Sequence, residues 1–336
     1  MSSSLASIAL ILLGGTITMT RDATGGIAPT LTADALLQAV PGLSDIADVI
    51  PQSPFRIPGA SLTIPHLVQV AQAAAAAVAE GATGVIVVQG TDTIEETAFA
   101  LDCLWTESAP LVVTGAMRGP EAAGADGPAN LLAAAIAASA PALRDMGVLV
   151  VLNDQVHAAA NVAKTHTGLC SAFVSRGAGP IAEICEGQVH LLSLVRRQVR
   201  GVSLPTTLTA SDVPSVAIFK PGLGEDARLL NALPGLGYTG LVVEAMGAGH
   251  VAEWLSDPLA DVARQIPVIL CSRAGDGPVF RSTYGFKGSE IDLIRKGLIP
   301  AGRLPAVKAR LLLQFLLVVG ADRTSIAKAF GSGSRR

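Results

Sequence analysis

Short and almost wholly apolar runs recur along the first half of the chain, and helical patterns separate them. Gly84–Gln89, Leu111–Thr114 and Val148–Leu152 have the length and the Val and Leu content of buried strands. Between them, Ile64–Ala79 and Ile94–Trp105 have the length of helices. A strand without polar alternation is covered on both faces, as in a parallel sheet between two layers of helices. The alternation therefore predicts an α/β fold, with a larger N-terminal domain whose mostly parallel sheet is flanked by helices.

This rhythm breaks near residue 195, where arginines and a polar stretch rich in Thr and Ser replace the apolar runs. Such a change between two regular regions is typical of a linker between domains. We therefore expect an N-terminal catalytic domain over residues 1–195, a linker over 196–214 and a smaller C-terminal α/β domain over 215–336. In that last domain the pattern predicts strands at Ser215–Phe219, Gly240–Glu244 and Pro267–Leu270, and helices at Asp226–Ala232, His250–Asp257 and Lys308–Val319.

The overall composition excludes several classes of function. A net charge of −3 and an isoelectric point near 6.0 give no basis for binding nucleic acid or an anionic membrane. The mean hydropathy of +0.51 is high, yet no run reaches the roughly 18–20 apolar residues that a membrane-spanning helix needs. The apolar run Ser7–Leu13 has no Lys or Arg before it, so we interpret it as a buried strand rather than a secretion signal. We therefore expect a protein of the cytoplasm.

The cysteines and histidines show no spacing typical of a metal site or a disulfide framework. Four cysteines and five histidines are scattered along the chain without a CxxC or HExxH pattern. Free thiols in a reducing compartment are the simplest interpretation of the cysteines. We expect neither a structural metal nor another cofactor.

Two motifs bring hydroxyl and carboxylate groups to the ends of predicted strands. Gly14-Gly15-Thr16 follows the first apolar run, and its glycines allow a sharp turn that ends in a hydroxyl. Gln89-Gly90-Thr91-Asp92-Thr93 follows another strand and opens a helix. Ligands of open parallel sheets bind beyond the carboxyl ends of the strands. The two motifs therefore mark one edge of the sheet as a candidate site.

Each motif also has a purely structural explanation. The first can be an ordinary glycine turn. In the second, Thr91 or Asp92 can be the N-cap of the following helix, with Glu95 or Glu96 completing a capping box. Capping accounts for one hydroxyl or carboxylate, but it does not require the whole Gly-Thr-Asp-Thr cluster.

A third polar segment, Asn153-Asp154, follows the strand Val148–Leu152, and Lys164-Thr165 lies in the loop beyond it. A loop lysine is normally a solvated surface charge. When Lys164 is instead desolvated beside a threonine hydroxyl and an aspartate, it can lose its proton more readily and serve as a base. Such a set suffices for acyl transfer without a cofactor, because a threonine nucleophile needs a base and its tetrahedral intermediate needs N–H donors.

Taken together, the motifs resemble those of the bacterial-type L-asparaginase/glutaminase family. The first threonine motif of the family is similar to Gly14-Gly15-Thr16-Ile17, and the second is similar to the stretch from Gln89 to Ala98. Further stretches that resemble the family are Gly115-Ala116-Met117-Arg118, Asp126–Leu131, Val150–Asp154, Lys164-Thr165 and Lys308–Gln314. The similarity therefore extends in order through both expected domains, and the Gly-Thr-Asp-Thr block is its most specific part.

The resemblance implies an enzyme that hydrolyses L-asparagine to L-aspartate and ammonia through an acyl-threonine intermediate, with glutamine as a possible side substrate. It assigns Thr16 as the nucleophile and makes a catalytic set of Thr91, Asp92 and Lys164. By the same resemblance, Asp92 also holds the α-amino group of the substrate, and the backbone contacts to the substrate come from Gly90 and Ala116. The family usually forms homotetramers built from intimate dimers, in which the C-terminal domain of one subunit completes a neighbour's site.

Two positions near the expected site depart from the family pattern. The lid after the first motif normally carries a tyrosine, and Ile27 stands at the matching position. Isoleucine cannot relay a proton, so either another group assists Thr16 or turnover is weak. Tyr284 is a candidate substitute, and a buried structural tyrosine is the alternative. In the substrate loop, Ser61 is expected to bind the α-carboxylate, and Gly59 is the other position that can match the family's serine.

The lid and the second domain carry three further features. The pair Gly25-Gly26 is expected to act as a hinge for the lid. Ala245–His250 replaces the family's glycine-asparagine loop and holds no asparagine. The acidic residue that reaches a neighbouring subunit's site matches Glu290, for which an exposed helix-capping acid is the alternative.

Three other functions fit parts of the sequence. The amide-releasing subunit of a tRNA-dependent amidotransferase usually has an extra N-terminal domain, for which we expect the early first motif to leave no room. A nucleotide-binding protein would carry GxGxxG or GxxxxGK(S/T), and Gly14-Gly15 lies in neither pattern. A weakly active or non-catalytic protein that binds asparagine or aspartate is the main alternative, because Ile27 replaces the lid tyrosine.

Overall fold

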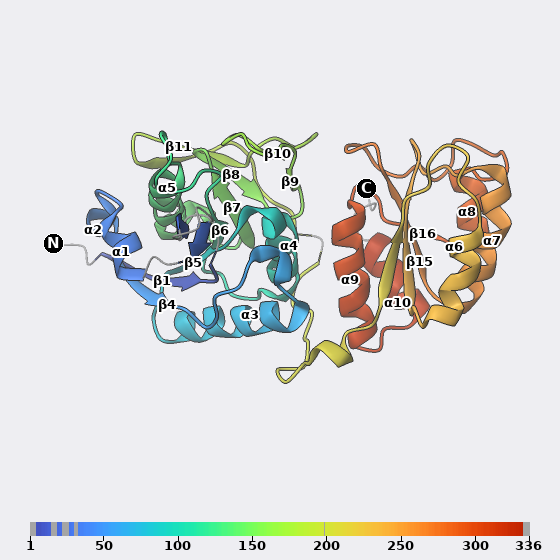
Figure 1. The fold of residues 1–336 in the computed structure, drawn as a ribbon, viewed down its shortest axis with the longest axis horizontal. Helices are drawn as coiled ribbons and strands as arrows, with labels where there is room; N and C mark the ends of the chain where they lie inside the picture. The colour runs from blue at the N-terminus through green and yellow to red at the C-terminus, as the bar shows by residue number, and fades with distance from the viewer. Residues whose placement is uncertain (1–4, 15–18, 22–26, 30–32, 198, 332–336) are drawn as a thin grey trace. The chain divides into compact units, whose positions relative to one another are not determined.

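The computed structural model describes residues 5–14, 19–21, 27–29, 33–197 and 199–331, and the chain divides into two compact units, Met1–Gly201 and Val202–Arg336. Each unit has its own sheet (Figure 1). Each also has its own hydrophobic core. The expected fold class is confirmed, because a larger unit with a mostly parallel sheet precedes a smaller α/β unit.

In the described part of the first unit, eight strands form the main sheet in the order β12-β11-β8-β7-β6-β5-β1-β4. From β7 to β4 neighbouring strands are parallel, whereas β8, β11 and β12 are each antiparallel to their neighbours. These strands span Ala6–Leu12 (β1), Ala47–Gln52 (β4), Gly84–Val88 (β5), Leu111–Thr114 (β6), Val148–Leu152 (β7), Gln155–Ala158 (β8), Ala182–Cys185 (β11) and Gln188–Leu191 (β12).

Helices cover both faces of this sheet, which explains why its central strands are almost wholly apolar. Along β1, Ile8, Leu10 and Leu12 pack with one group of helices (α1, α2 and α5), and the alternate residues pack with α3 and α4. Figure 1 shows α3 and α5 on opposite sides of the sheet. These helices span Ala33–Gln38 (α1), Leu43–Ile46 (α2), Ile64–Ala79 (α3), Ile94–Leu104 (α4) and Gly127–Ser139 (α5).

Local sequence sets the bounds of α3, which lie where the sequence predicts them. Thr63 and His66 form a reciprocal capping box at the start of the helix, and Pro65 lies in its first turn. At the other end, Gly81 adopts a φ of +111°, a conformation that residues with a side chain rarely take. The chain therefore leaves the helix at this glycine and enters β5.

Two small hairpins and three short 3₁₀ helices complete the described part of the first unit. Strands β2 (Met19–Arg21) and β3 (Ile27–Pro29) pair antiparallel, as do β9 (Val162–Lys164) and β10 (Phe173–Ser175). The 3₁₀ helices span Gly59–Ser61 (η2), Thr91–Thr93 (η3) and Pro141–Leu143 (η4). Of these, β9, η2 and η3 carry residues of the candidate site.

The second unit is a parallel sheet in the order β13-β14-β15-β16 with helices on both faces. Leucines of α6, α7 and α8 share one core with the sheet, and α9 contacts β13, β14 and β15. The strands span Val216–Phe219 (β13), Gly240–Ala245 (β14), Val268–Ser272 (β15) and Ile299–Pro300 (β16). The helices span Ala210–Asp212 (η5), Arg228–Ala232 (α6), Leu233–Leu236 (η6), Glu253–Gln265 (α7), Glu290–Arg295 (α8), Ala306–Val318 (α9) and Arg323–Gly331 (α10).

The predicted helix at His250–Asp257 was wrong in its bounds. Helix α7 begins three residues later, at Glu253, and continues to Gln265 through Pro258. Pro258 is the sixth residue of the helix, where a proline disfavours helix continuation, but the segment beyond it buries Leu259 and Val262. His250 instead belongs to a turn that pairs with Met246.

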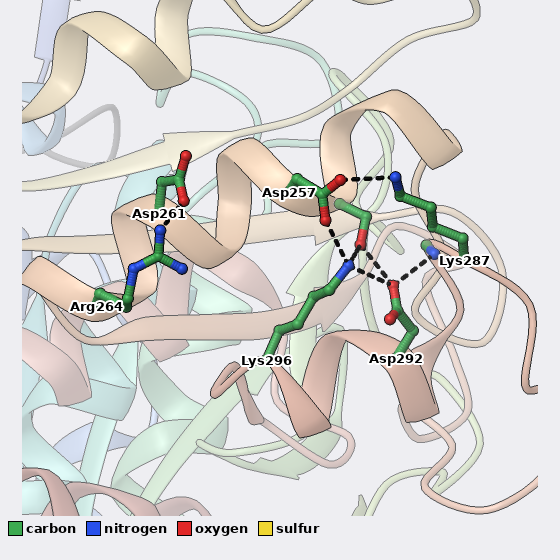
Figure 2. A network of polar contacts seen from close by, with 8 residues as sticks. Asp257, Asp261, Arg264, Lys287, Asp292 and Lys296 are labelled. Atoms are coloured by element: carbon green, nitrogen blue, oxygen red, sulfur yellow. Dashed lines mark hydrogen bonds and ion pairs between the residues drawn. The ribbon is translucent and has the colours of Figure 1, made fainter.

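A polar network joins α7 to α8 (Figure 2). Lys296 Nζ donates to Ser256 Oγ at 2.7 Å, to Asp257 Oδ1 at 2.8 Å and to Asp292 Oδ2 at 3.2 Å. Lys287 Nζ pairs with the other oxygen of Asp257 at 2.6 Å. The Ser256 hydroxyl donates to Asp292, so every member of this network has a partner within it.

Among the described residues, no helix combines the length and the apolar character that crossing a bilayer requires.

Candidate active site

The carboxyl ends of β1 and β5 bring the first motif beside the loop expected to bind the substrate, Ile57–Leu62. The Leu13 N–H donates to Val88 O at 2.9 Å, and the Ile57 N–H donates to Leu13 O at 3.0 Å. Gly14 has a φ of +109°, and a Cβ at this position would lie 3.1 Å from Ile57 O. Glycine is therefore required here by its dihedral angle and by the close backbone. The predicted nucleophile, Thr16, lies outside the described residues, in the segment 15–18.

The substrate loop lies directly against the second motif. The Thr93 hydroxyl donates to Gly59 O at 2.9 Å and accepts from Gln89 Nε2 at 3.2 Å. Gly59 is buried, and a Cβ there would lie 3.0 Å from Gly90 O, whereas Ser61 is exposed. The absence of a side chain at Gly59 thus lets its backbone lie close to that of Gly90. Ser61 keeps an accessible hydroxyl.

Lys164 contacts two neighbouring polar residues of the second motif, Thr91 and Asp92. Its Nζ lies 2.9 Å from Thr91 Oγ1 and 2.7 Å from Asp92 Oδ1. The Lys164 side chain is 14% exposed and that of Asp92 is 77% exposed, and Thr91 is buried. Three of the four predicted catalytic residues are therefore in contact, although more than seventy positions separate Lys164 from the other two in the chain.

The capping alternative for the second motif is wrong. The N-cap of α4 is Thr93, and no side chain makes a capping hydrogen bond there. The Thr91 hydroxyl accepts from Lys164 instead, and Glu95 Oε1 accepts from the Lys164 backbone N–H at 3.4 Å. These polar groups hold Lys164 rather than the end of the helix.

The expectation that Lys164 lies in a loop was also wrong. Asn153 and Asp154 have φ values of +52° and +59° and form the two-residue turn between β7 and β8. Lys164 then ends strand β9, where it pairs with Phe173 of β10. The lysine therefore reaches the site through antiparallel strands, not from the carboxyl end of a parallel one.

A buried histidine holds the hairpin that carries Lys164. His157 on β8 lies with its Nδ1 3.0 Å from the Ser175 hydroxyl on β10, and both residues are buried. Burial lowers the pKa of His157 to about 4, so its ring is neutral near pH 7.

The loop after β6 lies against the second motif. A Cβ at Gly115 would lie 2.5 Å from Gln89 O, so only glycine lets the two strand ends approach this closely. Asn130 Nδ2 donates to Gly115 O at 2.9 Å, and the Asp126 carboxylate accepts from the backbone N–H groups of Met117 and Arg118. These contacts position the loop that holds the buried Ala116.

A cavity of about 350 Å³ opens beside the lysine cluster. The described residues that line it are Asp92, Lys164, Thr165, His166 and Thr167. An exposed carboxylate on this cavity suits a ligand ammonium, and a lysine bonded to a hydroxyl suits proton transfer. No group of three or more His, Cys, Asp or Glu among the described residues could hold a metal ion.

The lid lies only partly within the described residues. Ile27 starts β3, and its backbone pairs with Arg21 of β2. The expected hinge, Gly25-Gly26, lies outside the described residues.

In the second unit, the alternative that Glu290 is an exposed acid capping a helix is wrong. This residue begins α8 and is fully buried, and Ser289 is the N-cap. The Glu290 carboxylate accepts from the backbone N–H groups of Thr283 and Tyr284 and lies 3.1 Å from His250 Nε2. Burial alone would raise the pKa of Glu290, but these donors hold it below its usual range. Tyr284 is 42% exposed, so the buried alternative for it is wrong as well.

Sequence reasoning missed several residues that shape this site. Glu95 was considered only as a capping partner, and His166 only as one of five scattered histidines. A usable signal was present, because His166 lies two positions after Lys164 and alternate residues of an extended chain face the same side. Asp126 and Asn130 lie in the family-like stretch Asp126–Leu131, but their contacts depend on how the loop after β6 folds and are not indicated by the sequence.

Two family models match the chain almost from end to end. The model described as Asparaginase, N-terminal matches residues 7–196. The model described as Glutaminase/Asparaginase C-terminal domain matches residues 215–330.

Individual proteins are similar over the same span. A protein of Deinococcus radiodurans named probable L-asparaginase is 36% identical over 99% of both chains. An L-asparaginase of Bacillus licheniformis is 30% identical over 92% of this chain and 95% of its own length. A crystal structure of a probable cytoplasmic L-asparaginase from Campylobacter jejuni has a TM-score of 0.85 at 30% identity, covering 97% of this chain and 99% of that one.

Proposed function

The chain belongs to the bacterial-type asparaginase family of amidohydrolases, and from this premise we propose that it hydrolyses L-asparagine through an acyl-threonine intermediate on Thr16. The products are L-aspartate and ammonia. The observation that carries the proposal is the contact of Lys164 Nζ with both Thr91 Oγ1 and Asp92 Oδ1 at the edge of a cavity. Family membership supplies the reaction class, and this contact supplies a base for it.

In the proposed first step, the Thr16 oxygen attacks the side-chain amide carbon of the substrate. Its proton passes to the Thr91 oxygen while the Thr91 hydroxyl proton passes to Lys164 Nζ, which enters this step as the neutral amine. A threonine hydroxyl is a weak nucleophile, so this acceptor is needed for the step. The C–N bond then breaks, and the nitrogen takes up a proton and departs as ammonia.

In the second step, water attacks the acyl-threonine ester and releases L-aspartate. The exposed Asp92 carboxylate holds the α-ammonium of the substrate in both steps. Ser61, or the backbone at Gly59, binds the α-carboxylate, and Gly90 and Ala116 supply backbone contacts to the substrate. The buried position of Ala116 beside the second motif supports a fixed backbone donor there. No cofactor is needed for either step.

The expected assembly and location extend this proposal. In a homotetramer built from intimate dimers, Glu290 would contribute to a neighbour's site, although its carboxylate already has partners within the second unit. The cytoplasm is the compartment we propose for the enzyme.

A second candidate function is binding of asparagine or aspartate with weak or no turnover. The observation that favours it is Ile27 at the start of β3, in the lid position where the family normally has a tyrosine. An aliphatic side chain cannot pass a proton to or from Thr16.

Ammonia release from L-asparagine tests the proposal and separates the two candidates. We expect the purified chain to release ammonia, and Thr16→Ala to lower the rate by about 10³-fold or more while the fold persists. Thr83→Val is the matched control. The Thr83 hydroxyl donates to Ser7 O near the amino ends of β5 and β1, away from the candidate site at their carboxyl ends. Wild-type turnover in Thr16→Ala would refute the nucleophile. L-aspartate binding without ammonia release by the wild type would establish the binding protein instead.

A further inference from the structure

His166 lines the candidate cavity together with Asp92 and Lys164. It lies two residues beyond Lys164, just after β9 ends, and it is exposed. The proposed reaction assigns it no part.

The hydrogen bonds of the His166 ring fix which nitrogen carries the hydrogen. Its Nδ1 accepts from the backbone N–H of Gly168 at 3.0 Å and of Leu169 at 3.1 Å. A nitrogen that accepts two N–H groups cannot also carry a proton without opposing both of them. The ring is therefore held as the neutral tautomer with its hydrogen on Nε2.

This arrangement makes His166 a hydrogen-bond donor rather than a proton relay. A relay through imidazole needs both nitrogens to exchange protons, and Nδ1 is committed to the loop. A neutral Nε2–H, in contrast, can donate to an oxygen of a ligand without changing charge. His166 is thus unsuited to replace the missing lid tyrosine, but it is suited to binding.

The other groups on the cavity leave a role for such a donor. Lys164 Nζ is bonded to Thr91 and Asp92, and the Thr165 hydroxyl donates to Ala172 O at 3.0 Å. The Asp92 carboxylate attracts the ammonium of an amino acid and repels its α-carboxylate. An α-carboxylate therefore needs donors away from Asp92. The proposed function gives it one, Ser61 or the backbone at Gly59, and His166 can supply another.

We propose that His166 is a substrate-binding residue whose Nε2–H donates to the α-carboxylate of the amino-acid ligand. The ligand class rests on the proposed function. The loop residues Gly168 and Leu169 act on the ligand only through the ring that they orient.

Two substitutions separate this role from support of the loop. In His166→Asn, Oδ1 stands near the place of Nδ1 and can still accept from the loop N–H groups, but the donor at Nε2 is lost. In His166→Gln, the amide reaches the place of Nε2 and restores a donor. His190→Asn is the matched control, because His190 is an exposed histidine on the edge strand β12.

We expect His166→Asn to weaken binding of L-aspartate, measured by titration calorimetry, by about tenfold. The KM for L-asparagine should rise by a similar factor while kcat changes less than about threefold, because the α-carboxylate is remote from the reacting amide. His166→Gln should recover part of the affinity, and His190→Asn should match the wild type.

Wild-type affinity in His166→Asn would overturn the proposal and leave the ring a support of its loop. A fall in kcat at unchanged KM would also overturn it, because the ring would then act on the reacting group. If the wild type releases no ammonia but binds L-aspartate, the proposed hydrolysis fails while calorimetry still tests His166. If the wild type binds no L-aspartate, both proposals fall.

Discussion

Two clusters in this chain combine a lysine, a hydroxyl and at least one aspartate at similar distances. In the first unit, Lys164 Nζ lies 2.9 Å from Thr91 Oγ1 and 2.7 Å from Asp92 Oδ1. In the second unit, Lys296 Nζ lies 2.7 Å from Ser256 Oγ, and two aspartates accept from the same ammonium (Figure 2). By distance alone, the two clusters are hard to tell apart.

The difference lies in what each cluster can offer a ligand. Ser256 is fully buried, and its hydroxyl is engaged with Lys296 and Asp292. The Thr91 cluster instead borders a cavity, and the Asp92 carboxylate is 77% exposed. An accessible charge does not separate the clusters, because the Asp257 side chain is also 62% exposed. The adjoining cavity does separate them, and it marks the Thr91 cluster as the candidate reactive centre.

The two clusters also arise from different parts of the fold. The second-unit cluster fastens the packed helices α7 and α8 to each other. The first-unit cluster forms where the 3₁₀ helix after β5 meets the end of a hairpin. Strand ends and their loops leave space above a sheet, which is why ligands of α/β proteins bind there.

The largest effect should come from removing the hydroxyl in each cluster. Thr91→Val keeps the size of the side chain, and we expect it to lower the rate of ammonia release by about 10³-fold, because the proton acceptor for Thr16 is lost. Ser256→Ala should change the rate by less than about threefold and lower the melting temperature instead. Equal losses of rate in the two variants would erase the distinction between the clusters.

Acid should affect the two units differently, because their titrating groups differ. The pKa of His157 is about 4 in the folded chain and about 6.5 in an unfolded one. Between these values only the unfolded chain binds the proton, so the first unit should lose up to about 3 kcal/mol of stability as pH falls from 6.5 to 4. In the second unit, Lys287 and Lys296 lower the pKa of Asp257 to about 2, so its ion pairs persist over this range and are lost only as pH falls through about 2.

The two tryptophans allow this difference to be measured. Trp105 lies in the first unit and Trp254 in the second, so Trp254→Phe and Trp105→Phe each leave one reporter. Urea unfolding is measured at pH 7 and pH 4.5. The free energy of unfolding reported by Trp105 fluorescence should fall more between these two pH values than the one reported by Trp254. Adding His157→Gln should flatten the Trp105 response to pH, and an unchanged response would show that another group titrates.

A smaller effect is expected from the lysine of the second-unit cluster. Lys296→Met leaves the hydroxyl and carboxylates around it short of a donor, and we expect it to lower the free energy of unfolding by about 1–2 kcal/mol, as measured in urea. The estimate is modest because the Asp257 side chain is 62% exposed. A loss near zero would show that the cluster does not fasten α7 to α8.

The smallest effect is expected beside that cluster, at a pair that Figure 2 shows separately. Asp261 and Arg264 lie three positions apart on α7, and both side chains are more than half exposed. Arg264→Ala should change the free energy of unfolding by less than about 0.5 kcal/mol, because exposed ion pairs contribute little. If Arg264→Ala lowered the free energy of unfolding as much as Lys296→Met does, membership of the polar network would not be what makes Lys296 stabilising.

The sequence predicted the parallel part of the fold and the sheet edge that holds the candidate site. Apolar runs with polar or turn-forming residues at their ends, such as Leu111–Thr114 and Val148–Leu152, have the predicted bounds in the structure. Because parallel strands end at a common edge, the motifs at Gly14 and Gln89 were expected to meet, and their strands are neighbours. The catalytic roles given to these motifs stay predictions.

The antiparallel part of the first unit could not be predicted in the same way. Strands β8 to β12 are three or four residues long, and short strands with polar residues resemble loops in a single sequence. Lys164 was therefore placed in a loop, although its position depends on pairing with Phe173. The burial of Glu290 likewise depends on backbone N–H groups from a loop that no local pattern indicates.

Parallel assays of Lys164→Met and Lys296→Met for ammonia release from L-asparagine show which of the two clusters is catalytic. Methionine keeps the length of each side chain and removes the ammonium. We expect a loss of about 10³-fold or more in Lys164→Met and a change of less than about threefold in Lys296→Met. Wild-type turnover in Lys164→Met, with its fold intact, would contradict the assignment of the first-unit cluster as the catalytic centre.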